Sequence, residues 1–151
     1  MYQLYQEQVL TASQEELWDF ISRPENLNEI TPPEMEFTIV SDVPKKMYTG
    51  LIIEYRVKLP LLGTQDWVTE IKHIISGQQF VDEQRIGPYK FWYHYHALQE
   101  TEQGIKMIDR VSYQPPFGLL GKVANSLFIS SKLDSIFGFR KKVMDKRFNG
   151  K

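Results

Sequence analysis

The feature that most constrains the fold is an apolar stripe between Leu119 and Phe148. Apolar side chains recur there largely at steps of three and four residues, which places them on one face of an α-helix. They are Leu120, Val123, Ala124, Leu127, Leu133, Ile136, Phe137, Val143, Met144 and Phe148. A helix of that span is roughly 45 Å long, and it cannot bury such a stripe by itself. The rest of the chain must supply a partner surface.

The chain before this stripe is typical of one short helical region and a series of strands. Ser13 and Glu16 have the spacing of a capping box at the start of a helix. Pro24 suits the first turn of a second short helix, which ends at Thr31-Pro32-Pro33. Alternating or β-rich segments bounded by turn residues predict strands at residues 2–10, 37–40, 50–59, 64–75, 79–86, 91–99 and 105–113, with turns at 60–63 and at Gln103-Gly104.

The connections between these strands are too short for parallel crossovers, so the predicted sheet is antiparallel. We therefore expect an α+β fold over residues 1–151, as a single domain. A curved antiparallel sheet of about six to seven strands would wrap around the long C-terminal helix, with two short helices after the first strand. A strongly bent sheet around one helix leaves room for a ligand cavity between them.

Composition excludes several classes of function. The 151 residues include no cysteine, so neither a disulfide framework nor a thiolate nucleophile or ligand is available. No apolar run approaches the length of a transmembrane helix, and the N-terminus lacks the features of a signal peptide, so we expect a cytoplasmic protein. The aromatic strands are not basic, which argues against nucleic-acid binding. The sequence contains neither a Gly-rich phosphate loop nor a nucleophile-elbow serine.

The net charge of −1 is unevenly distributed along the chain. Basic residues are concentrated in the C-terminal helix and outnumber its acidic residues Asp134 and Asp145; they are Lys122, Lys132, Arg140, Lys141, Lys142, Lys146, Arg147 and Lys151. One interpretation is that they complement the helix dipole and form a solvated face. The other is a weak binding surface for an anionic partner.

Candidate chemistry is concentrated on the strand at 91–99. Trp92, His94 and His96 alternate and share one face. A turn centred on Glu102-Gln103 would place His96 opposite Asp109, and Trp92 opposite Tyr113 on the next strand, whereas a three-residue loop would exchange the faces of the strand. A buried Asp109 needs a partner, and a histidine beside it would have a raised pKa. His94, His96 and Asp109 are therefore the candidates for catalysis, and a self-satisfied structural pair is the alternative.

Other polar residues give weaker predictions. Asp82 and Gln84 share a face with Phe80, and they either join the histidines or face solvent. His94 and His96 would supply two metal ligands, but His73 belongs to a different strand and no cysteine is present, so we expect no metal site and no cofactor.

Several short motifs, in this order, resemble those of the SRPBCC or START-like superfamily, whose helix-grip fold is that of the major birch-pollen allergen. They are Asn26-Leu27 with Ile30-Thr31-Pro32-Pro33; Phe80, Asp82 and Gln84 with Gly87-Pro88-Tyr89; Trp92, His94 and His96; Asp109, Val111 and Tyr113 with Pro116 to Gly121; and Ile136-Phe137 with Arg140. The similarity covers nearly the whole chain, and it points to a bacterial ligand-binding or polyketide cyclase/dehydrase-like branch. It implies a cavity for an apolar small molecule and no one shared reaction.

These observations predict a protein that binds an apolar or amphipathic small molecule between the sheet and the C-terminal helix. The alternatives are a cyclase- or dehydratase-type enzyme that uses the histidines and Asp109 as acid–base groups, and a protein-interaction module with a vestigial cavity. The residues expected to contact the ligand are Trp67, Asp82, Gln84, Trp92, His94, His96, Met107, Asp109 and Tyr113.

Overall fold

The sheet is the largest element of the structure, a computed structural model that describes residues 1–59 and 62–150. Its seven strands are all antiparallel and lie in the order β1-β7-β6-β5-β4-β3-β2. Their bounds are β1 (Tyr2–Leu10), β2 (Thr38–Ile39), β3 (Ile52–Leu59), β4 (Gly63–Ile75), β5 (Gln79–Ile86), β6 (Phe91–Thr101) and β7 (Gly104–Gln114). The predicted α+β helix-grip fold is confirmed, and the predicted turn at 60–63 lies partly outside the described residues.

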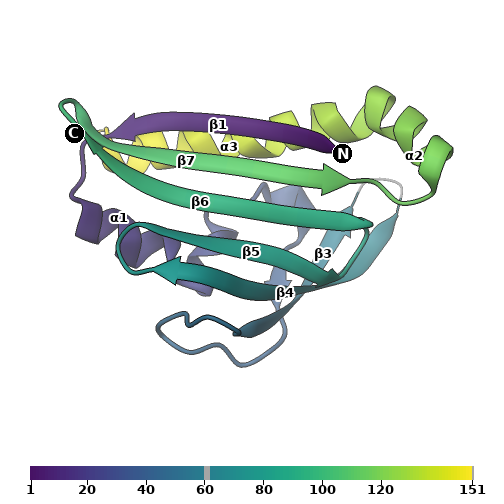
Figure 1. Ribbon diagram of the computed structural model, residues 1–151, viewed down its shortest axis with the longest axis horizontal. Helices are drawn as coiled ribbons and strands as arrows, with labels where there is room; N and C mark the ends of the chain where they lie inside the picture. The colour runs from purple at the N-terminus through teal and green to yellow at the C-terminus, as the bar shows by residue number, and fades with distance from the viewer. Residues whose placement is uncertain (60–61, 151) are drawn as a thin grey trace.

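Helices follow the first strand and end the chain. Those after β1 are α1 (Gln14–Ile21) and the short 3₁₀ helices η1 (Pro24–Asn28) and η2 (Pro33–Met35); those at the end are α2 (Gly118–Ala124), the π-helical turn η3 (Asn125–Ile129) and α3 (Ser130–Phe148). Figure 1 shows α3 running along one face of the sheet, beside β1 and β7. Within the described residues, we find no helix with both the length and the apolar character needed to cross a bilayer.

A helix cap and a glycine turn set the path of the chain around the sheet. The Ser13 hydroxyl accepts from the Glu16 amide and the Glu16 carboxylate accepts from the Ser13 amide, which confirms the predicted capping box. Gly104 closes the β6–β7 turn with a φ of 133°, and a Cβ there would lie 2.5 Å from the carbonyl oxygen of Leu10. Only glycine fits both the dihedral and the close approach of β1.

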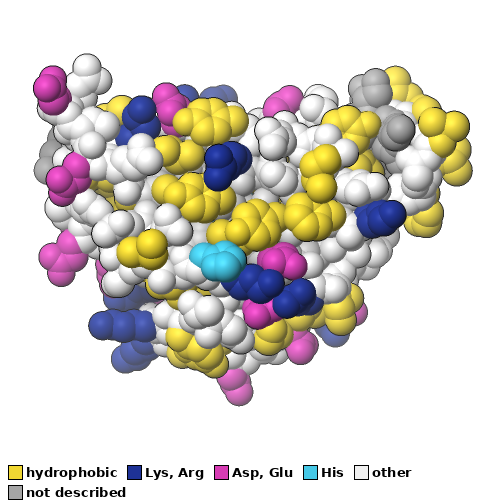
Figure 2. Space-filling model, viewed as in Figure 1, with side chains coloured by type: hydrophobic (Ala, Val, Ile, Leu, Met, Phe, Trp, Pro, Cys, Tyr) yellow, Lys and Arg dark blue, Asp and Glu magenta, His cyan; other side chains and the backbone are white. Residues whose placement is uncertain are grey.

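The C-terminal helix differs from the single rod that the sequence predicts. Only the α3 part of the stripe is buried, through Leu133, Phe137 and Met144. In the earlier part Leu120, Val123 and Leu127 are exposed, so the expectation that Leu127 faces the sheet is wrong, and the side chain of Ala124 lies outside the described residues. Figure 2 shows hydrophobic side chains gathered at the end of the molecule where Figure 1 places α2.

The spacing between the exposed and the buried parts of the apolar stripe explains this difference. Leu127 and Leu133 are six residues apart, which does not return to the same face of an α-helix. The π-helical turn η3 falls in this gap, and its wider turns rotate the faces of α2 and α3 relative to one another. Ser130-Ser131, which also interrupts the stripe, begins α3.

The inward faces of the strands are those that alternation predicts. On β3 the buried side chains are Ile53, Tyr55 and Val57, with Leu51 just before them. On β7 the buried series is Ile105, Met107, Asp109, Val111 and Tyr113. One member of that series is a carboxylate in an otherwise apolar row, and it marks where the functional site is built.

Candidate functional site

A cavity of about 160 Å³ lies between the sheet, the segment from α1 to η2, and α3. Apolar side chains make most of its wall, among them Ile30, Met35, Tyr55, Trp92, Met107 and Phe137. Polar side chains reach it at Thr31, Thr69, Asp82, His94, His96 and Arg140. The cavity is thus apolar with a concentrated polar region, as is common for small-molecule sites.

Three neighbouring strands place the acidic and histidine side chains of this region together. In the sheet register Asp82 on β5 is paired with His94 on β6, and His96 on β6 is paired with Asp109 on β7. The predicted pairings of His96 with Asp109 and of Trp92 with Tyr113 are confirmed, because the β6–β7 turn has Glu102-Gln103 at its centre. Residues two apart on β6 share a face, so both histidines point to the cavity side.

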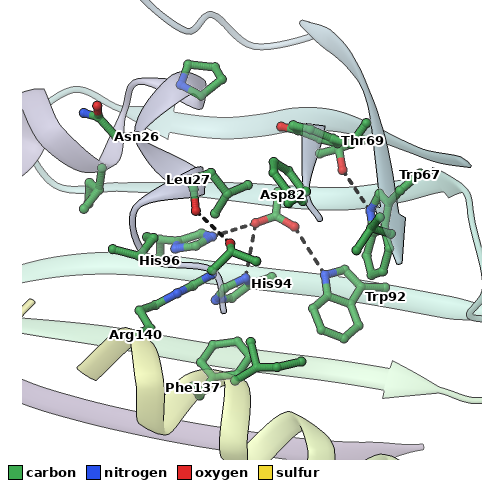
Figure 3. Close-up of a pocket in the computed structure, with 18 of the residues that line it drawn as sticks. Asn26, Leu27, Trp67, Thr69, Asp82, Trp92, His94, His96, Phe137 and Arg140 are labelled. Carbon is green, nitrogen blue, oxygen red and sulfur yellow. Dashed lines mark hydrogen bonds and ion pairs between the residues drawn. The ribbon is translucent and has the colours of Figure 1, made fainter. Parts of the chain in front are cut away.

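The two carboxylates lie on opposite sides of the two imidazole rings. Asp109 Oδ1 is 2.8 Å from His94 Nε2 and 3.3 Å from His96 Nδ1. Asp82 Oδ2 is 2.6 Å from His96 Nε2 and 3.2 Å from His94 Nδ1. Every ring nitrogen of both histidines therefore faces a carboxylate oxygen, and Figure 3 shows the Asp82 side of this cluster.

Arg140 joins the cluster from α3, which sequence analysis did not foresee because it assigned this residue to the basic surface. Its Nη1 lies 3.2 Å from Asp109 Oδ1, and both side chains are buried. Its Nε is buried without a hydrogen-bond partner, the one such side-chain atom among the described residues. A signal was present: Arg140 stands between Phe137 and Met144 at helical spacing, on the buried face of α3.

The electrostatics of the cluster follow from this geometry. Burial by itself would raise the pKa of Asp109, but hydrogen bonds from the histidines and the charge of Arg140 outweigh it and hold that pKa well below its ordinary value. The pKa of Asp82 is lowered in the same way against its burial, by His94 and His96. Burial disfavours the charged form of His96, yet the two carboxylates raise its pKa above the ordinary value.

Aromatic side chains hold the histidine rings in place. Phe80 stacks on His96 with the ring centres 4.2 Å apart, and the centres of the His94 and His96 rings are 3.7 Å apart. Phe137 from α3 meets His94 edge to face. Trp92 Nε1 donates to Asp82 Oδ1 over 3.3 Å, which fixes the orientation of that carboxylate. The polar groups are therefore positioned by packed side chains from both the sheet and the helix.

Most of the residues predicted to contact a ligand lie at the cavity, and Gln84 and Tyr113 have other surroundings. Trp67, Asp82, Trp92, His94, His96 and Met107 line the cavity, and Asp109 lies buried against the histidines. Gln84 instead exchanges hydrogen bonds with the backbone of Tyr89 in the β5–β6 connection. Tyr113 is buried among aromatic side chains, with Tyr2 and Tyr89 beside it.

Three basic residues of the C-terminal helix are buried or paired with acidic side chains. Arg140 is buried, Lys132 is paired with Glu34, and Arg147 is paired with Glu29. Lys151 and the side chain of Lys122 lie outside the described residues. An anionic partner at this helix stays a prediction.

Comparisons with solved structures give the class of fold. Protein CV1439 from Chromobacterium violaceum is 10% identical to the chain, with 98% of each chain covered and a TM-score of 0.74. A START superfamily protein from Mycobacterium smegmatis is 11% identical, with 99% of each chain covered and a TM-score of 0.69. A nucleoside-diphosphate sugar epimerase from Corynebacterium glutamicum is 20% identical, and the likeness covers 93% of this chain and 28% of that one at a TM-score of 0.66.

The chain therefore has the START-like helix-grip fold, as the sequence resemblance implies. At these identities the likeness shows the fold alone. No protein-family model matches the chain, and no curated protein matches it in sequence. The cavity and its polar side chains are the features of the structure that bear on function.

Proposed function

We propose that this chain binds a small apolar or amphipathic molecule in the cavity, with an oxygen-bearing end of the molecule at Arg140. The observation that carries the proposal is the buried Arg140 Nε, which has no hydrogen-bond partner and belongs to a residue that lines the cavity. A buried donor left unpaired costs about 1–3 kcal/mol. Because Arg140 lines the cavity, its charged guanidinium would also stabilise an oxygen atom of a ligand bound there.

The size and wall of the cavity support a compact ligand. A volume of about 160 Å³ is close to the ~150 Å³ of an apolar protein cavity that takes up benzene. The wall offers rings and aliphatic chains, and Trp92 and Phe137 stand beside the polar region. These dimensions favour a molecule built on one or two rings over an extended acyl chain.

The same geometry argues against acid–base catalysis as the primary function. A catalytic imidazole must present a nitrogen to the substrate. All four ring nitrogens of His94 and His96 have a carboxylate oxygen within 3.3 Å. The cyclase- or dehydratase-type enzyme therefore ranks second, and the cavity itself argues against an interaction module that has lost its pocket.

Dye uptake tests the binding proposal. The protein should take up 1-naphthol with saturable, one-site fluorescence behaviour, and small aromatic molecules should compete. Met107→Trp fills the cavity and should abolish uptake while circular dichroism stays native. Met107→Leu conserves volume and is the matched control. Uptake that does not saturate, or that is equal in the tryptophan variant and wild type, would overturn the proposal.

A ligand series tests the role of Arg140. Wild-type protein should bind 2-naphthoate and 2-naphthol more tightly than naphthalene. Arg140→Met should reduce that preference, because the methionine keeps an apolar stem and offers no donor. Arg147→Met, at the exposed arginine of the same helix, is the control and should retain the preference. Equal affinity for all three ligands in wild type would remove Arg140 from the site.

A further inference from the structure

We propose that Asp82, His94 and His96 form a binding site for a divalent first-row transition-metal ion at the polar region of the cavity. One ligand atom from each residue converges there, and the three atoms all lie within 4.8 Å of one another. Figure 3 shows the three side chains turned toward one another from β5 and β6. The third histidine, His73, whose place on another strand led us to expect no metal site, is exposed on β4, and Asp82 takes the place beside His94 and His96 instead.

The spacing of the ligand atoms is near that of a metal site. Bonds of 2.0–2.1 Å in tetrahedral geometry separate the ligand atoms by about 3.3 Å. The distance from Asp82 Oδ2 to His94 Nδ1 is 3.2 Å, and that to His96 Nε2 is 2.6 Å. The contact between Asp82 Oδ2 and His96 Nε2 would have to lengthen by about 0.7 Å to reach that separation.

The surroundings of the histidines are those that metal-binding histidines need. A ligating histidine usually donates its other ring N–H to a carboxylate, which fixes the tautomer and the ring orientation. Asp109 Oδ1 faces His94 Nε2 and His96 Nδ1, the two nitrogens that point away from Asp82. One buried carboxylate therefore orients both rings, and it leaves His94 Nδ1 and His96 Nε2 for the ion.

The remaining contacts hold the two carboxylates in these separate roles. Arg140 Nη1 pairs with Asp109 Oδ1 and so keeps that carboxylate ionised and in place. Trp92 Nε1 holds Asp82 Oδ1, which leaves Asp82 Oδ2 directed to the histidines.

The donor set defines the class of ion. Two imidazoles and one carboxylate without a thiolate suit Zn²⁺, Fe²⁺ and neighbouring first-row ions, and are poor for Mg²⁺ or Ca²⁺. Three protein ligands leave at least one coordination position open. Because Asp82, His94 and His96 all line the cavity, that position would be accessible to an oxygen of a bound small molecule.

Calorimetric titration of chelator-treated protein with Zn²⁺ tests the site directly. Wild type should bind one equivalent in a saturable manner. Asp82→Asn keeps the shape of the side chain and should weaken binding at least tenfold, while His73→Gln, at the exposed histidine, should leave it unchanged. No binding in wild type, or equal binding in wild type and Asp82→Asn, would overturn the site.

A second measurement uses the wild type alone, so it gives a result even if Asp82→Asn fails to fold. Addition of one equivalent of Zn²⁺ should shift the ring ¹⁵N resonances of His94 Nδ1 and His96 Nε2 and leave those of His73 in place. Shifts confined to His73, or spread over surface residues without His94 and His96, would contradict the proposal. The result does not depend on uptake of any organic ligand, so it is independent of the binding function proposed above.

Discussion

The two parts of the C-terminal helical segment share one apolar spacing but have opposite surroundings. In α3, Phe137 is 3% exposed and Met144 is fully buried, whereas Leu120 in α2 is 76% exposed and Leu127 in η3 is 61% exposed. The stripe alone therefore predicts a helix and not its burial. Burial depends on whether a second surface lies opposite, and the sheet supplies one to α3.

α3 also buries a charged side chain. α3 places Arg140 in the interior, where Asp109 on the central part of β7 compensates it. It also docks on β1 through its backbone, because Gln6 Nε2 donates to the carbonyl oxygen of Phe137 over 2.9 Å. The buried part of the segment is thus held by apolar packing, an ion pair and an edge-strand hydrogen bond together, and each can be tested separately.

The largest effect is expected from Phe137→Ala. The ring packs among Trp92, Val111 and Leu133, so its removal leaves a cavity and should lower the free energy of unfolding by about 3–5 kcal/mol. Urea unfolding followed by fluorescence measures this. A loss below about 1 kcal/mol would mean that α3 is no better packed than α2 and would remove the contrast between them.

A smaller loss is expected from Asp109→Asn. Asparagine keeps the shape of the side chain but not the charge that compensates Arg140, and hydrogen bonds to charged groups are worth about 1.5–3 kcal/mol. Urea unfolding should show a loss in that range. The control is Asp66→Asn, which removes an exposed carboxylate paired with Arg56 and should have little effect. Equal effects of the two substitutions would show that the interior pair does not help to hold α3.

The pH dependence of stability is a finer test of the same interior. In metal-free protein the pKa of His96 is raised, so its contacts with the carboxylates contribute stability that is fully present below its ordinary pKa of 6.5. That contribution is lost as the pH rises through the folded pKa. NMR titration should give a folded His96 pKa above the ordinary value in wild type and a lower one in Asp109→Asn. If the substitution leaves the His96 pKa unchanged, His96 does not pair with Asp109.

The smallest effect is expected from Leu127→Ala. Leu127 is largely exposed, and substitutions at exposed sites usually change stability by less than about 0.5 kcal/mol. When both variants are measured under the same conditions, the difference between their losses in the free energy of unfolding compares the packing of the two parts of the segment. A loss comparable to that of Phe137→Ala would mean that Leu127 is buried in solution.

Most of the fold could be predicted because it depends on local patterns. Alternation on β7 places Asp109 inward, and the two-residue turn at Glu102-Gln103 sets the β6–β7 register. Hydrogen bonds in the site were harder to predict. His96 is directly opposite Asp109 in the register, yet the shorter contact to Asp109 is made by His94, because side chains lean diagonally across the pleat.

The sequence left the positions of the two remaining members of the cluster, Asp82 and Arg140, undecided. Asp82 joins it through the β5–β6 register, whose connection around Gly87 and Pro88 is too long for turn rules to determine the pairing. Arg140 comes from a different layer of the fold, and a charged residue on a helix is usually exposed. Its position on the apolar face of α3 was the available signal.

The contact between Arg140 and Asp109 also has a consequence for how the chain is made. On the ribosome β7 emerges before α3, so Asp109 is synthesised 31 residues ahead of the guanidinium that neutralises it. Until α3 docks, burial of β7 against the histidines would leave that carboxylate without Arg140, which opposes closure of the interior. A chain that stops before Arg140 lacks both this charge and Met144 of the buried face of α3, so its interior should be more accessible to proteases than that of the full chain.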